Sequence, residues 1–110
     1  MANLKIETFN MLEQCGKTVS DVRWVGSSAF SIPLELFWRL ADTFYDKGYG
    51  SPEVAIDLIV VGDDWWLERH EYDGSEWWEY KTIPQKPHDE KTVARLIAGG
   101  IGWKTLAEMN

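Results

Sequence analysis

The chain has 110 residues, enough for one hydrophobic core and too few for a second domain. Hydrophobic residues make up 45% of it and charged residues 26%, which is the composition of a folded protein and not of a disordered chain. Eighteen Asp and Glu outnumber eleven Lys and Arg, and a net charge of -7 repels the phosphates of nucleic acids. We therefore expect one soluble domain over residues 1–110 that does not bind nucleic acid directly.

The single cysteine, Cys15, has no partner for an internal disulfide, so nothing in the sequence indicates an oxidising compartment. The first residues lack the basic region and long apolar run of a signal peptide. No stretch approaches the ~18 apolar residues of a membrane span. These features predict a cytoplasmic protein without a membrane partner.

Two helices and a short strand are predicted in the first half of the chain. Apolar residues at helical spacing predict a first helix over residues 3–15, which Gly16 ends. The β-branched and aromatic run at residues 22–25 predicts a strand. A second helix is expected to begin near Pro33, where a missing N–H is tolerated in the first turn, and to end at Gly48.

The pattern then changes from helical to extended. Residues 54–61 are apolar nearly throughout, which is typical of a central strand covered on both faces. Two turn signals each reverse the direction of the chain, which predicts further strands over residues 65–72 and 77–82. The sequence therefore predicts a three-stranded antiparallel meander over residues 54–82.

A third helix is predicted to begin near Asp89, with Val93, Leu96 and Ile97 on its apolar face, and to break at the glycine run that follows. One or two further helical turns are expected over residues 103–109. The order of these elements predicts an α+β fold in which a three- to four-stranded antiparallel sheet carries the helices on one face.

The register of the last hairpin decides which tryptophans enter the core. A two-residue turn at residues 73–74 sets up two like-charge pairs, among them Glu68 opposite Glu79, and each destabilises the strand pair. A four-residue loop over residues 73–76 instead places Glu68 opposite Lys81. We prefer the longer loop on electrostatic grounds, although Asp-Gly favours the shorter turn.

Both registers give the same two faces, because they differ by an even number of residues. The more apolar face is expected to lie under the helices, and it carries Trp65, Leu67, Arg69, Glu71, Trp78, Tyr80 and Thr82. The opposite face carries Trp66, Glu68, His70, Tyr72, Trp77, Glu79 and Lys81, and the first six of these residues are called the outer strip below. Aromatic residues among charges often form interaction surfaces, so the outer strip is the predicted partner-binding site. In the alternative, neighbouring Glu and Lys stems half-bury its two tryptophans.

Signals for catalysis are weak. Glu79 and Lys81 form an acidic-x-Lys step of the kind found in metal-dependent nucleases, and Asp57 or Asp64 would supply a second carboxylate. A surface ladder of Glu and Lys explains the same pattern. His70 is expected to pair with a cross-strand Glu, because no nucleophile or second ligand is spaced to assist it. We therefore predict no catalytic residue, no metal ligand and no cofactor.

The stretch DLIVVGDDWWLERHEYDGSEWWEYKTIPQKP, at residues 57–87, resembles a family of small proteins encoded by phages and prophages of low-GC Gram-positive bacteria. The segments DVRWVGS and DKGYG extend the resemblance to most of residues 18–87. The resemblance implies expression in a bacterial cytoplasm and an accessory role in phage biology. It supplies no catalytic residues.

These observations together lead us to expect a non-enzymatic protein–protein interaction module. Its partner would be a host or phage protein with a basic surface, and inhibition of a host or defence protein is one such role. The alternatives are a small metal-dependent hydrolase, a homodimer formed through the same strip, and a structural subunit of a phage particle.

Overall fold

The computed structural model describes residues 1–48, 50–100 and 102–110. Its helices are α1 (Leu4–Gln14), α2 (Leu34–Ala41) and α3 (Leu106–Met109), with a short 3₁₀ helix at Val19–Asp21. Its strands are β1 (Ala2–Asn3), β2 (Trp24–Gly26), β3 (Ser31–Ile32), β4 (Phe44–Tyr45), β5 (Ile59–Val61), β6 (Trp65–Tyr72) and β7 (Ser75–Thr82). The predicted α+β class is confirmed.

The main sheet has five antiparallel strands among the described residues, in the order β3-β2-β5-β6-β7. The predicted meander is present as β5, β6 and β7. The prediction of three to four strands was too low, because β2 pairs with β5 and then turns into β3. Strand β5 is also shorter than the predicted residues 54–61, because the N–H groups of Glu53 and Val54 donate to the Glu76 carboxylate and not to a neighbouring strand.

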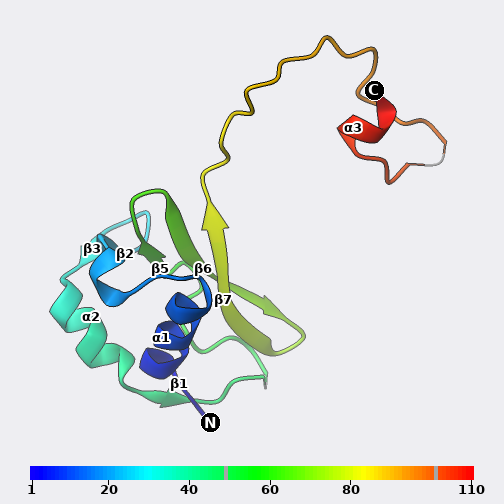
Figure 1. Ribbon diagram of the computed structural model, residues 1–110. Coiled ribbons are helices and arrows are strands. Elements are labelled where there is room, and N and C mark those ends of the chain that lie inside the picture. Colours follow the sequence, from blue (N-terminus) through cyan, green and yellow to red (C-terminus); the bar gives the residue numbers. More distant parts are fainter. Residues whose placement is uncertain (49, 101) are drawn as a thin grey trace.

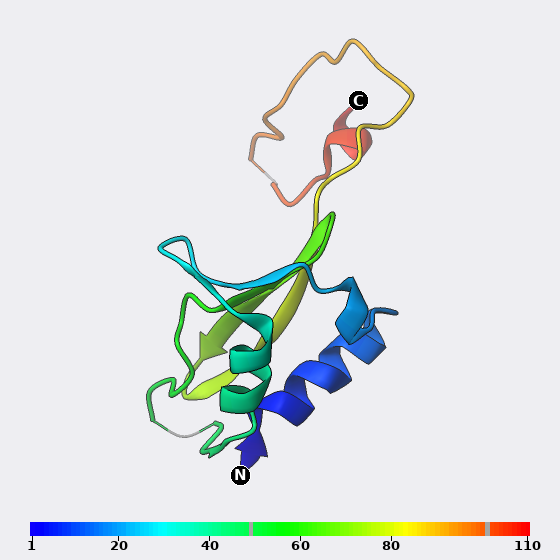
Figure 2. The ribbon, with the colours of Figure 1, turned by 90° about the vertical axis from the view of Figure 1, so that its left-hand side faces the viewer.

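Helices α1 and α2 lie on the same face of this sheet, as predicted (Figures 1 and 2). The core between them and the sheet consists of Leu12, Val22, Val25, Phe37, Ala41, Val60, Trp65, Leu67 and Trp78. Trp65 and Trp78 are buried, whereas Trp66 and Trp77 are only partly covered. The prediction that one tryptophan of each adjacent pair enters the core while the other lies on the outer face is therefore confirmed.

Helix α2 is shorter than predicted. It ends at Ala41 and not at Gly48, because β4 pairs antiparallel with β1. The Asn3 side chain holds this region together, since its amide donates to Asp42 at 2.9 Å while its carbonyl oxygen accepts the Ile6 N–H at 3.1 Å. Asn3 thus caps α1 and links it to the end of α2.

The preferred hairpin register was wrong. Strands β6 and β7 are joined by the two-residue turn at Asp73 and Gly74, with Tyr72 opposite Ser75. Both turn residues have positive φ, 50° and 85°, as the tight hairpin turn requires. Local turn chemistry therefore outweighs the like-charge pairs, and Glu68 lies opposite Glu79.

The predicted third helix from Asp89 is also wrong. Residues 83–110, called the C-terminal arm, leave the end of β7 and extend away from the sheet (Figure 1). Among the described residues of the arm, 83–100 and 102–110, only α3 is helical. The radius of gyration, 18.4 Å, exceeds the ~13 Å of a compact chain of this length. Leu96 and Ile97 are 74% and 81% exposed, so no packing stabilises a helix there.

The tight approach of Trp65 to the turn before β6 generates a prediction. A Cβ at Gly62 would collide with the Trp65 indole ring, whereas a Cβ at Gly100 would meet nothing. We expect Gly62→Ala to lower the free energy of unfolding by about 1–3 kcal/mol, because the core side chain must move. Urea unfolding measures this loss, with Gly100→Ala as the matched control. Equal stability of the two variants would contradict this packing.

Candidate functional site

The outer strip is formed by alternate residues of β6 and β7 on the face away from α1 and α2. Tyr72 lies beside the hairpin turn and is 76% exposed. The other five residues are partly covered. The half-burial of Trp66 and Trp77 agrees with the alternative in which neighbouring side chains cover them. The strip is therefore a solvent-facing surface with one prominent aromatic residue at its end.

A continuous chain of polar contacts runs across this strip. His70 Nε2 lies 2.7 Å from a Glu68 oxygen, and His70 Nδ1 lies 2.8 Å from a Glu79 oxygen. The Trp66 indole N–H donates to the second Glu68 oxygen at 2.6 Å, and Lys81 Nζ lies 3.5 Å from Glu79. The His70 ring therefore lies between the two carboxylates that this register brings opposite each other.

The Glu68 carboxylate is held in its charged form. The hydrogen bond from Trp66, followed by the one from His70, keeps the pKa of Glu68 below its usual value. The strip thus presents a fixed negative group beside a half-buried indole.

A second charged network lies beneath the strip, on the inward face of the same strands. Arg69 donates to Glu7 of α1 and to Glu76 of β7, both at 2.9 Å. The side chains of Arg69 and Glu76 are each only 3% exposed. The guanidinium lies 4.8 Å from the Trp78 ring, whose indole N–H donates to Thr8 of α1 at 2.9 Å. This network attaches α1 to the sheet.

Three further hydrogen bonds extend the network. Glu76 accepts the N–H groups of Glu53 and Val54, at 2.7 and 3.2 Å. The Tyr45 hydroxyl donates to Glu7, and burial followed by this hydrogen bond raises the pKa of Tyr45 well above its usual value. Sequence reasoning placed Arg69 on the inward face but missed the network. The sequence signal for the network was Arg69 itself, a charged residue two positions after the core residue Leu67 and therefore on the same face of the strand.

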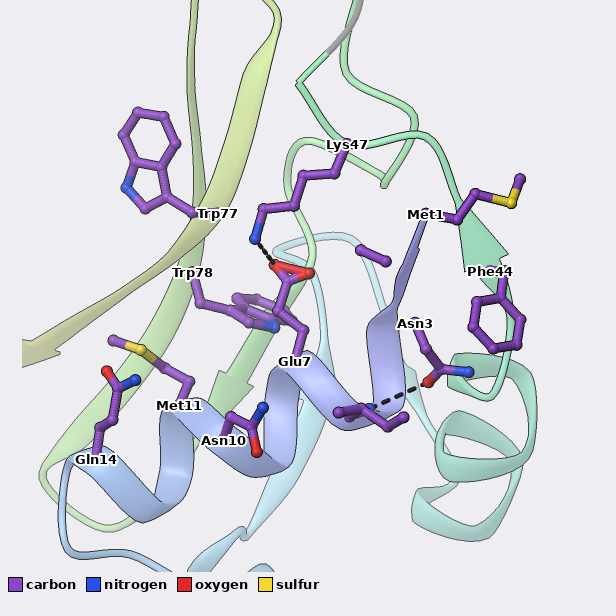
Figure 3. A pocket seen from close by; sticks show the side chains of 12 residues that line it. Met1, Asn3, Glu7, Asn10, Met11, Gln14, Phe44, Lys47, Trp77 and Trp78 are labelled. Carbon is purple, nitrogen blue, oxygen red and sulfur yellow. Dashed lines mark hydrogen bonds and ion pairs between the residues drawn. The ribbon is translucent and has the colours of Figure 1, made fainter.

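The network opens into a groove beside α1, called the α1 groove, with a volume of about 480 Å³ (Figure 3). Lys47 reaches Glu7 there at 3.4 Å. The lining comprises Met1, Ala2, Asn3, Ile6, Glu7, Asn10, Met11, Gln14, Phe44, Lys47, Trp77 and Trp78. Ile6 and Phe44 are exposed at its rim, so the groove presents apolar surface around one ion pair. Sequence reasoning missed this groove as well.

The residues of the hydrolase alternative are not assembled as a metal site. Asp57 and Asp64 lie in exposed turns on either side of β5, while Glu79 contacts His70 and Lys81. Within residues 1–48, 50–100 and 102–110, no three His, Cys, Asp or Glu side chains gather in a way that would hold a metal ion. The Glu79–Lys81 pair is part of the surface ladder.

None of the helices in the described part of the chain has the length and apolar composition needed to cross a membrane. No protein-family model, curated protein or solved structure matches the chain. The resemblance to a phage protein family therefore stays a prediction, and the function is inferred from the geometry of the strip, the network and the groove.

The buried network yields a prediction about stability. Arg69→Ala leaves the buried Glu76 carboxylate without its cation and leaves Glu7 with Lys47 alone, and we expect a loss of about 3–5 kcal/mol in the free energy of unfolding. The control is Arg23→Ala, which removes an exposed pair with Asp63 and is expected to cost no more than ~1 kcal/mol. Urea unfolding followed by tryptophan fluorescence compares them. Similar losses would show that the network is not structural.

The Glu68 contacts yield a prediction about pH. Because folding depresses the pKa of Glu68, its carboxylate contributes stability above its unfolded pKa of ~4.3, and this contribution is lost as the pH falls through the folded pKa. The stability difference between wild type and Glu68→Gln should therefore be largest near pH 6 and shrink towards pH 3. Unfolding curves at several pH values test this, with Glu13→Gln on the exposed side of α1 as the control. A difference that does not change with pH would rule out the contribution.

Proposed function

We propose that this protein is a non-enzymatic interaction module that binds a basic surface of another protein through the outer strip. The observation that supports the proposal is the chain of contacts from Trp66 through Glu68 and His70 to Glu79. These contacts fix the carboxylates before any partner arrives. A surface ordered in advance loses less side-chain freedom on binding.

The distribution of charge supports a basic partner. Residues 1–82 carry fifteen Asp and Glu against seven Lys and Arg, a net charge of -8. A field of one sign increases the rate of encounter with a partner of the opposite sign and disfavours partners of the same sign. Asp73, exposed beside Tyr72, extends the negative charge to the hairpin turn.

The aromatic side chains would supply most of the contact area. Tyrosine and tryptophan dominate the binding energy of many interfaces because they bury a large area with few rotatable bonds. Tyr72 is largely exposed, and Trp66 and Trp77 are partly exposed, so a partner has aromatic surface to cover. In the phage setting that the sequence resemblance implies, the partner would be a host enzyme with a basic nucleic-acid-binding groove. The protein would act as its inhibitor.

The test compares partner capture by strip and control variants. Wild type, Tyr72→Ala and Phe30→Ala are immobilised and exposed to lysate of a low-GC Gram-positive host. Phe30 is 69% exposed in the loop between β2 and β3, so its removal leaves the strip intact. We expect Tyr72→Ala to recover at least tenfold less of a basic protein, and recovery to fall with added salt. Equal recovery by wild type and Tyr72→Ala would discard the proposal.

A further inference from the structure

The C-terminal arm contains a helix-forming sequence that has no packing partner. Residues 89–98 begin with acidic residues, which favour the first turn of a helix, and space Val93, Leu96 and Ile97 on one face. Gly99 follows with a φ of 83°, the conformation common just after a helix end. Yet the segment is not helical and these apolar side chains are exposed. An amphipathic helix of this length requires a surface to pack against.

The arm also differs in charge from the rest of the chain. It carries four Lys and Arg against three Asp and Glu, a net charge of +1, whereas residues 1–82 carry -8. Residues 89–98 themselves hold two acidic and two basic residues, so their packing rests on the apolar face. Lys86 and Lys104, on either side of this segment, supply the attraction between the arm and the acidic body of either copy.

We infer that residues 89–98 of one copy fold into a helix in the α1 groove of a second copy, and that the second copy returns its own arm to the first. The groove follows α1 from its N-cap Asn3 to Gln14. This course is about 16 Å long at the rise of an α-helix, and a ten-residue helix is about 15 Å long. The two helices would therefore lie side by side over their full lengths.

The chemistry of the two surfaces is complementary. The groove exposes Met1, Ile6 and Phe44, the last of them 63% exposed, around the paired charges of Glu7 and Lys47. The arm brings an apolar face of matching kind. Packing an amphipathic helix into an apolar groove is a common mode of peptide recognition.

The course of the chain favours a second copy over the arm's own groove. The arm leaves the body at the end of the sheet far from β1 and leads away from α1 (Figure 1). Pro84 and Pro87 keep the first residues of the arm extended, because proline fixes its own backbone and restricts the residue before it. Reaching its own groove would require the chain to reverse within this stretch. Exchange around a twofold axis needs no reversal and covers two grooves at once.

The first test measures the oligomeric state at protein concentrations on the order of 1 to 100 µM, because exchanged dimers of modest affinity dissociate in this range. Sedimentation should show a monomer–dimer equilibrium, and far-UV circular dichroism should show helix content rising with concentration. A Leu96→Asp, Ile97→Asp variant should raise the dimer dissociation constant at least tenfold and abolish that rise. Phe30→Asp, at a largely exposed apolar residue outside the groove, should change neither the dissociation constant nor the helix content.

The second test separates exchange between copies from folding back within one. Phe44→Asp in the groove should weaken the dimer as the arm variant does. Mixing the two variants should restore dimerisation in part, because a mixed dimer keeps one of the two contacts with both an intact arm and an intact groove. Overturning results are a wild type that stays monomeric, dimers that the arm variant does not weaken, or a mixture that stays monomeric. Tyr72→Ala should dimerise normally, so failure of this inference is distinguishable from failure of the proposed outer-strip function.

Discussion

The buried Arg69 between Glu7 and Glu76 is the constraint on which the rest of the structure depends. A charged group removed from water is tolerated only when it is paired and hydrogen-bonded, so the three side chains must stay together. They come from α1, β6 and β7. Through Glu76 the network also fixes the chain at Glu53 and Val54, which brings the segment before β5 against the last strand.

The same constraint determines the character of the opposite face. Because side chains alternate along a strand, turning Arg69 inward turns its neighbour His70 outward. His70 then reaches Glu68 and Glu79 on the two strands. The interior network and the outer strip are therefore two results of one register.

Much of this fold was predictable from local patterns. Helical and alternating periodicity correctly indicated α1, the meander and the outward side of Trp66 and Trp77. The hairpin register was mispredicted because only directly opposed charges were weighed. The ring of His70 lies between the Glu68 and Glu79 carboxylates. The Glu76 carboxylate accepts hydrogen bonds from the backbone N–H groups of residues 53–54, which lie far from it in the sequence.

The remaining errors have non-local causes as well. Strand β4 replaces the end of the predicted second helix because it pairs with β1, some forty residues earlier in the chain. The α1 groove combines side chains from both ends of α1 with Phe44, Lys47 and Trp78, and no single stretch of the sequence indicates it. The arm carries a sound helical pattern, but a pattern describes what a segment is able to form and not whether a surface is present to support it.

The two-residue turn at Asp73 and Gly74 has an evolutionary consequence. Inserting one residue anywhere between Leu67 and Glu79 would exchange the inward and outward side chains beyond it, leaving a charge in the core and an indole in the wrong layer. The length of this hairpin should therefore be invariant among descendants of the gene. The loop between β2 and β3, and the stretch around Pro84 and Pro87, face no such restriction and are where lineages are free to gain or lose residues.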